Sequence, residues 1–381
     1  MGDLANAYQY LGRFDEALEA AKRGLTIDRD LGHDRSTAAS LAQIAAILVE
    51  QQRYAEADAR YDEALSTARA AGDLGLQGSI LQHQGILQDN MGNNDRAVDL
   101  YRQAINLFQR ANNPGSEMRT CNQLAMAERN RSHLDAAEAW YDRARELALK
   151  LNDRYQLAII AQNVSILYQT RAQEASDPEA RIALLRQATT SVDESLKIKL
   201  EMDNQVGAAA SYSQLGILYQ MLGDLDQAEE NSKQALEIRK SLNLPDVYKS
   251  YGVLAEIARA RGDQEAAAEW QAKYEAKVAE LEKLRRGEGA GGQPAGMQEQ
   301  VVKAIMALAQ AAFNARKSNA LLPPEAAELL AQITQLPPPM GGIGPFLQAI
   351  AQGEDIPPMP PELPPELGEI LNSLVEAIRQ V

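Results

Sequence analysis

Small residues recur along the first three quarters of the chain at constant intervals. In most copies, a small residue is followed by further small residues 12 and 19 positions later, often with an aromatic residue 16 positions later; the last copy is decayed. The third copy, for example, runs from Gly85 through Ala97 and Tyr101 to Ala104. The copies start at Ala5, Ala45, Gly85, Ala125, Ser165, Gly216 and Ala255. A period of about 40 residues is typical of a repeat array in which each unit packs only on its neighbours.

Each copy is long enough for two helices, and turn signals separate them. Segments 11–15, 91–95 and 222–226 each place a glycine shortly before an aspartate or asparagine. The glycine is predicted to end the first helix in the left-handed conformation, and the acidic or amide side chain to cap the second. The small residues let the two helices approach closely, and the aromatic side chain fills the adjacent groove. The chain is therefore predicted to be all-α.

One interval between copies is longer than the others. Ser165 and Gly216 are 51 residues apart, which is 11 more than the usual step of 40. Eleven residues make about three helical turns, so such an insertion lengthens a helix pair without changing which faces pack. Segment 172–185 fits this insertion, with Asp177 and Pro178 turning between the two lengthened helices.

The repeated residues resemble a known family. Leu215, Gly216 and Tyr219, followed by Ala228 and Ala235, are similar to the tetratricopeptide repeat. The 40-residue step resembles the longer-helix variety found in kinesin light chains, Pins-type adaptors and MalT-type bacterial regulators. The resemblance implies a right-handed superhelical solenoid of about seven helix-turn-helix repeats over residues 1–284, although the proline that usually closes each repeat is absent. The first repeat lacks the N-terminal turns of its siblings, which suggests a fragment or an upstream partner.

The C-terminal quarter has a different composition. Residues 285–297 are glycine-rich and are predicted to be a linker, and residues 298–381 form a proline-rich tail. Three short amphipathic helices are predicted in this tail, at 298–317, 324–336 and 365–381. They pack as a small helical appendage, recruit another protein or stay disordered.

Charge and cysteine content narrow the class of protein. The net charge of −15 argues against nucleic acid and anionic membrane surfaces as partners. A single cysteine excludes a disulfide framework and a cysteine-ligated structural zinc site. The sequence has no run of about 18 apolar residues and no signal peptide, so we expect a cytoplasmic protein without a membrane span.

The sequence offers little catalytic chemistry. His33, His83 and His133 fall at different positions of the repeat and so cannot meet in a regular array. Cys121 occupies a position that packs inside the repeat, where a thiol is inert. No phosphate-loop, dinucleotide-binding, zinc-protease or nucleophile-elbow motif is present. An accessory hydrolase built on scattered acids would need a deep polar pocket. We therefore expect no catalytic residue, metal or cofactor, and no enzyme.

A ladder of amide side chains marks the expected binding face. In the family that the chain resembles, the first helix of each pair lines a concave groove. The residues two and three positions before the first small residue of each copy point into this groove, and further polar residues lie along the same helices. Amides donate and accept hydrogen bonds, so they can pair with an extended peptide backbone, or they can simply solvate an exposed face. Arg119 and Arg129 would add a preference for acidic peptides. The expected partner-binding residues are Gln43, Gln82, His83, Asp89, Asn90, Arg119, Asn122, Gln123, Arg129, Asn130, Gln162, Asn163, Gln169, Gln214 and Gln220.

These observations favour a non-catalytic protein–protein interaction scaffold that binds a peptide or protein segment in its groove. The resemblance to bacterial regulators implies the sensor part of a larger signalling protein. Two alternatives stay open. The chain is either an adaptor whose own C-terminal tail occupies the groove, or a module that assembles through its first repeat.

Overall fold

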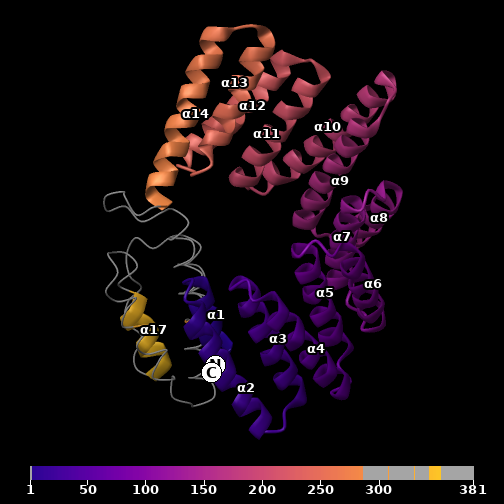
Figure 1. The fold of residues 1–381 in the computed structure, drawn as a ribbon, viewed down its shortest axis with the longest axis vertical. Coiled ribbons are helices and arrows are strands. Elements are labelled where there is room, and N and C mark those ends of the chain that lie inside the picture. Colours follow the sequence, from indigo (N-terminus) through magenta and orange to yellow (C-terminus); the bar gives the residue numbers. More distant parts are fainter. Residues whose placement is uncertain (1, 286–307, 309–329, 331–342, 353–381) are drawn as a thin grey trace. The chain divides into compact units, whose positions relative to one another are not determined.

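The computed structural model describes residues 2–285 and 343–352, together with Leu308 and Leu330 (Figure 1). Every regular element in this part of the chain is an α helix. The helices are α1 (Gly2–Tyr10), α2 (Phe14–Asp30), α3 (Asp34–Glu50), α4 (Tyr54–Ala70), α5 (Leu74–Asn90), α6 (Asn94–Arg110), α7 (Pro114–Asn130), α8 (Leu134–Leu151), α9 (Arg154–Glu174), α10 (Pro178–Glu201), α11 (Gln205–Leu222), α12 (Leu225–Ser241), α13 (Val247–Arg261), α14 (Gln264–Arg285) and α17 (Ile343–Gln352).

The chain divides into two compact units. The first unit is formed by Met1–Leu76 with Gln293–Val381, and the second by Gln77–Gly292. In the first unit, α1 packs on α2 and α3 on α4; in the second, α7 packs on α8, α9 on α10, α11 on α12 and α13 on α14. Within each unit, the second helix of a pair also contacts the first helix of the next pair, as α8 contacts α9. These successive pairs confirm the predicted all-α repeat array.

The small residues lie where paired helices touch, as predicted. Ala97 and Ala104 on α6 are fully buried. A Cβ atom added to Gly85 on α5 would lie 2.5 Å from Cε1 of Tyr101 on α6, far inside van der Waals contact. The tyrosine ring therefore packs directly on the backbone of α5, and a side chain at Gly85 would force the helices apart.

Many of the turns between helices contain a residue in the left-handed conformation. The glycines of the three predicted turns adopt it, with φ values of 72°, 78° and 81° at Gly12, Gly92 and Gly223. The predicted caps are present only in part. Asp224 accepts a hydrogen bond from the first turn of α12, but Arg13 and Asn93 hold the corresponding positions without a capping bond. At the first of these turns the capping prediction was wrong because Asp15 falls inside the first helical turn, where it meets the positive end of the helix dipole. At the second, Asn93 holds the cap position, but its side chain donates to Oε1 of Gln88 at 2.9 Å and makes no capping bond.

The pair α9 and α10 is longer than its neighbours (Figure 1). These helices have 21 and 24 residues, compared with 17 in each of α6 and α7. Asp177 caps α10 by accepting a hydrogen bond from the backbone nitrogen of Ala180 at 3.1 Å, and Pro178 is the first residue of the helix. Proline suits this position because the first helical nitrogen has no partner inside the helix.

The C-terminal region holds one helix that the sequence pattern did not predict. In α17 the buried side chains of Ile343, Phe346, Leu347 and Ile350 recur at helical spacing. Glycine and proline within and before its first turn concealed this pattern. The three predicted tail helices at 298–317, 324–336 and 365–381 lie outside the described residues, apart from Leu308 and Leu330. None of the described helices combines the length and apolar character that a membrane crossing needs.

Candidate functional site

The predicted amide residues lie on the first helix of each pair and bond to one another between repeats. In the first unit, Gln43 on α3 donates from Nε2 to Oδ1 of Asn6 on α1 at 2.7 Å and to the carbonyl oxygen of Gly2 at 3.0 Å. An amide that was expected to face a partner thus already joins two successive first helices.

The same arrangement links α5, α7 and α9 in the second unit. Gln82 on α5 donates to Oε1 of Gln123 on α7 at 2.7 Å, and Asn163 on α9 donates to Oδ1 of Asn122 on α7 at 3.0 Å. Asn122 is buried, with 8% of its surface exposed, so its side chain serves this contact more than it serves solvent. A ladder bond uses one amide N–H and one carbonyl oxygen, and each primary amide has two N–H groups and two lone pairs. The ladder therefore retains capacity for a further partner.

The ladder continues to α11 through a cluster of buried polar groups. Gln162 on α9 donates to Oε1 of Gln214 on α11, whose own Nε2 donates to Oγ of Ser165 at 2.7 Å. Oε1 of Gln162 accepts from Nζ of Lys199 at 2.9 Å and from Oγ of Ser211 at 3.0 Å. Burial lowers the pKa of Lys199 to about 8, because the charged ammonium loses its hydration.

Other predicted residues of this face bond to their own helix or stay open to solvent. A ring nitrogen of His83 lies 2.7 Å from the carbonyl oxygen of Ser79, one turn earlier, and Arg119 donates to Oγ of Ser116 at 3.1 Å. Gln169 reaches the next repeat through Sδ of Met221 at 3.5 Å. Residues with exposed or half-buried side chains on these helices are His83, Asn90, Arg119, Asn130, Gln169 and Gln220.

Asp89 and Arg129 differ from the amides because each has a buried polar atom without a hydrogen-bond partner among the described residues. Oδ2 of Asp89 accepts from the hydroxyl of Tyr101 at 2.8 Å, while Oδ1 is buried and bonds to no described residue. Burial raises the pKa of the Asp89 carboxyl, against the opposing effect of the Tyr101 hydrogen bond. Nη1 of Arg129 is likewise buried without a partner in the described part of the chain, and so is the hydroxyl of Tyr141.

The sequence analysis missed a second set of polar residues at the junctions between repeats. Lys199 on α10 donates to Oγ of Ser211 on α11 at 2.8 Å, and Arg239 on α12 donates to Oγ of Ser250 on α13 at 2.7 Å. The two pairs occupy equivalent positions of successive repeats. Their counterparts in the second, third and fourth repeats are apolar (Ala68, Phe108 and Ala148), whereas Asp28 of the first repeat accepts from Oγ of Ser40 at 2.6 Å. A cation at a position where sibling repeats carry alanine or phenylalanine was the available signal.

A buried carboxylate at the end of α7 collects three basic groups. The side chain of Glu128 is 1% exposed and lies 2.8 Å from Arg102, 2.9 Å from Arg131 and 3.0 Å from Nδ1 of His133. Arg131 also pairs with Asp95 at 2.8 Å. This cluster fixes the turn between α7 and α8 to α6, and it places His133 at the edge of a pocket.

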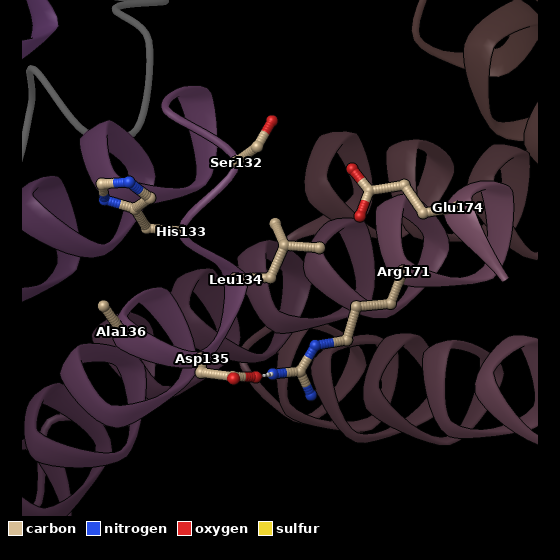
Figure 2. A pocket seen from close by; sticks show the side chains of 7 residues that line it. All are labelled: Ser132, His133, Leu134, Asp135, Ala136, Arg171 and Glu174. Carbon is tan, nitrogen blue, oxygen red and sulfur yellow. Dashed lines mark hydrogen bonds and ion pairs between the residues drawn. The ribbon is translucent and has the colours of Figure 1, made fainter.

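The pocket lies beside this turn and has a volume of about 470 Å³ (Figure 2). Its lining comes from the turn, the first residues of α8 and the last turn of α9. Asp135 pairs with Arg171 at 2.7 Å across it, and the carboxylate of Glu174 adds a second negative charge. The lining residues are Ser132, His133, Leu134, Asp135, Ala136, Arg171 and Glu174.

Two features bear on catalytic chemistry. Among the described residues, no three histidine, cysteine or acidic side chains are grouped so as to hold a metal ion. Cys121 is fully buried, as predicted, and burial raises the pKa of its thiol to about 12, with the charge of Glu117 acting in the same direction. A thiol with this pKa is protonated near neutral pH and is a poor nucleophile.

Helix pairs of this length and spacing belong to the class of helical-repeat proteins. Sequence profiles of the tetratricopeptide repeat match residues 1–29, 36–110 and 207–276. The chain is a tetratricopeptide repeat protein, and the predicted resemblance to this family is confirmed. The family generally provides non-catalytic scaffolds for protein–protein interactions. A search of curated proteins found no match.

Several solved structures are similar to the chain at low sequence identity. A signal transduction ATPase with numerous domains (STAND) from Pyrococcus horikoshii, which carries a tetratricopeptide repeat sensor, is 14% identical with a TM-score of 0.50. This match covers 97% of the present chain and 52% of the archaeal one. BtubC of P. vanneervenii is 19% identical with a TM-score of 0.41, over 74% of this chain and 94% of that one. A tetratricopeptide repeat protein of Thermus thermophilus is 21% identical with a TM-score of 0.39, over 55% and 96% of the respective chains.

Proposed function

We propose that the chain is a scaffold that binds an extended segment of a partner protein along the face formed by the first helices of its repeats. The observation that carries this proposal is the amide ladder, which runs through α5, α7, α9 and α11. Its members hold one another in fixed register. Gln82 and Gln123 each keep an N–H group and a lone pair for a peptide backbone, whereas both lone pairs of Gln162 Oε1 are taken by Lys199 and Ser211. Preorganised amides of this kind bind without a large loss of side-chain entropy.

The proposal extends to a sensory role. The fold is shared with a STAND protein whose tetratricopeptide repeats form a sensor, and the present chain spans about half of that protein. In this role the bound segment is the signal, and its capture changes the state of a neighbouring domain or partner. Because the likeness extends only to the fold, the sensory role rests on the binding proposal and needs its own test.

The binding proposal is tested with a random peptide library. Phage-displayed dodecapeptides are selected on the full chain, and recovered peptides are titrated against Gln123→Ala and Gln214→Ala. Each variant should weaken binding several-fold, because each removes an amide of the ladder. Gln103→Ala and Asn106→Ala serve as controls, since both residues lie exposed on the second helix α6. Failure to recover any peptide, or an equal loss with the control variants, would refute the proposal.

A further inference from the structure

Two opposite charges lie on neighbouring helices of the second unit at equivalent places in successive repeats. Asp89 is on α5, and Arg129 is on α7, 40 residues later. The hydrogen bond from Gln82 to Gln123, at 2.7 Å, holds α5 beside α7 about two turns earlier along both helices. Asp89 follows Gln82 by seven residues, and Arg129 follows Asn122 by seven. Both charges therefore continue the face that carries the amide ladder.

Each charge leaves one buried atom without a hydrogen bond. These atoms are Oδ1 of Asp89 and Nη1 of Arg129, and the hydroxyl of Tyr141, whose ring is fully buried, is also unpaired among the described residues. Burial raises the pKa of the Tyr141 hydroxyl to about 12, and the charge of Arg129 opposes this shift. Unpaired buried polar atoms cost folding free energy and are rare in native proteins, so each calls for an explanation.

The repeat itself supplies a comparison. Asp89 and Tyr101, Arg129 and Tyr141, and Arg259 and Gln271 are equivalent pairs in three repeats. Tyr101 donates to Asp89 at 2.8 Å, and Arg259 donates to Oε1 of Gln271 at 2.6 Å. Arg129 and Tyr141 each keep an unpaired buried atom instead. The equivalent positions can therefore satisfy each other, and the repeat geometry alone does not account for the unpaired atoms at Arg129 and Tyr141.

We propose that Asp89 and Arg129 together recognise one peptide unit of a bound extended peptide. The peptide N–H donates to Oδ1 of Asp89, and the peptide oxygen accepts from Nη1 of Arg129. This inference rests on the proposed function and names the chemistry of one of its contacts. Side chains of α5 and α7 reach one another, as the 2.7 Å hydrogen bond from Gln82 to Gln123 shows. One amide group can therefore join Asp89 and Arg129 by hydrogen bonds of about 2.9 Å.

The two opposite charges select a neutral dipolar group over an ion. A carboxylate would pair with Arg129 but would be repelled by Asp89. An ammonium group would pair with Asp89 but would be repelled by Arg129. An amide presents a donor and an acceptor and satisfies both charges without repulsion. Asp89 and Arg129 are only half-buried, so small side-chain rotations bring their unpaired atoms to a ligand on the open face.

The test uses the full chain with phage-displayed random dodecapeptides as the probe. A labelled synthetic copy of the strongest binder is then titrated by fluorescence anisotropy. Asp89→Asn and Arg129→Met are the test variants, and Asp99→Asn and Arg110→Met, which alter exposed charges on α6, are matched controls. Hydrogen bonds to charged groups are strong enough that each test variant should raise Kd about tenfold or more. The controls should change Kd less than about twofold.

Two further measurements separate recognition from a structural role. Thermal melts of the free variants should show an unchanged or higher Tm. Both substitutions remove a half-buried charge that carries an unpaired buried atom, and the amide oxygen introduced by Asp89→Asn still accepts from Tyr101. A scan that replaces each peptide unit of the binder by an ester, and so deletes one N–H, should reveal a sensitive position at this site besides any that face the ladder. That position should lose its sensitivity in Asp89→Ala, since the acceptor is then absent.

The failures of this test are distinguishable. If peptides are recovered but bind equally well to both test variants, the assignment of this site is wrong while the proposed function stands. A clearly lower Tm for both variants, with binding lost only in proportion to unfolding, would make the residues structural and overturn the inference. If no peptide is enriched over a selection without the chain, the proposed function and this site fail together.

Discussion

The ammonium nitrogen of Lys199 lies 2.8 Å from Oγ of Ser211 in a buried junction between α10 and α11. Its other hydrogen-bond acceptor is Oε1 of Gln162, so both acceptors are neutral, and Lys199 forms no ion pair with a described residue. At the next junction Arg239 occupies the equivalent position, but there Asp246 approaches its Nε to 3.3 Å. The charge of Lys199 is therefore buried without an opposing charge, which is why its pKa falls to about 8.

Replacing Lys199 by methionine should stabilise the chain at neutral pH. Removing a buried charge without a counter-charge should raise the free energy of unfolding by about 1–2 kcal/mol at pH 7. The polar neighbours stay bonded, because Ser211 still donates to Gln162 at 3.0 Å. The folded pKa is about 8, below the ordinary lysine value of 10.5, so between these pH values the unfolded chain binds more protons. The stability of the native protein then rises with pH, and the advantage of the variant shrinks.

The measurement is urea unfolding of both proteins at about pH 7, 8.5 and 10, a range that spans the folded and unfolded pKa values. Lys197→Met is the matched control, since Lys197 lies exposed on the same helix. The control should show no comparable gain in stability at neutral pH. A difference between Lys199→Met and the parent that stays constant over the whole pH range would contradict the expected deprotonation of Lys199.

Substitution of Glu128 should destabilise the second unit. Glu128→Gln removes the charge that Arg102, Arg131 and His133 share, and leaves basic groups facing a buried amide. We expect the free energy of unfolding to fall by about 2–3 kcal/mol. Asp95→Asn is a sharp control, because Asp95 also pairs with Arg131 but is 88% exposed. That control should cost less than about 0.5 kcal/mol. Equal losses in urea unfolding would show that burial of Glu128 does not matter.

The helix pairs and their contacts could be predicted from the sequence because only a few types of side chain fit between two closely packed helices. Close contacts between paired helices, such as that between Gly85 and Tyr101, leave room only for a small residue, so glycine, alanine or serine recurs in register and reveals the period. The burial of Cys121 followed from the same periodicity. In each case the available space restricts the residue type at one position, and a restriction of this kind is visible as a repeated residue type in a single sequence.

The site could be predicted only in outline. The positions of Gln82 and Gln123 on the first helices followed from the repeat, but their bond to each other did not, because it joins side chains of two repeats. Lys199 was overlooked because a lysine on a helix is normally taken as exposed. The unpaired atoms of Asp89 and Arg129 depend on side-chain conformations, which no spacing encodes.

The thiol of Cys121 should report on global unfolding. Because it is fully buried and its pKa is about 12, we expect almost no reaction with a disulfide reagent in mildly alkaline buffer in the native chain. Complete reaction should follow in a denaturing concentration of guanidinium chloride. As a control, Gln103→Cys adds a thiol on the exposed face of α6, and that thiol should react at once. Rapid native reaction of the parent chain would mean that α7 opens readily.

Gly85→Ala tests the close contact on which the repeat is built. The new Cβ would lie 2.5 Å from Cε1 of Tyr101 and 2.8 Å from its Cδ1, so the ring or the helix must move. Overpacking of this kind should lower the free energy of unfolding by about 2 kcal/mol. A matched control is Gly115→Ala on α7, where the nearest atom is 3.9 Å away, and this substitution should be neutral or slightly stabilising.

The decisive form of this test is the same substitution beside a smaller neighbour. The second and fourth repeats carry an alanine with a tyrosine at the positions of Gly85 and Tyr101, so the steric conflict is particular to the ring position of Tyr101. The fifth repeat carries Ser165 and Val192 there, a Cβ facing a smaller side chain. In a Tyr101→Val background, Gly85→Ala should therefore cost close to nothing, because the colliding ring is gone and alanine favours the helix by about 1 kcal/mol over glycine. Urea unfolding of the four proteins gives the coupling energy between the two positions. An equal cost of Gly85→Ala in both backgrounds would mean that backbone strain, and not the tyrosine ring, selects glycine here.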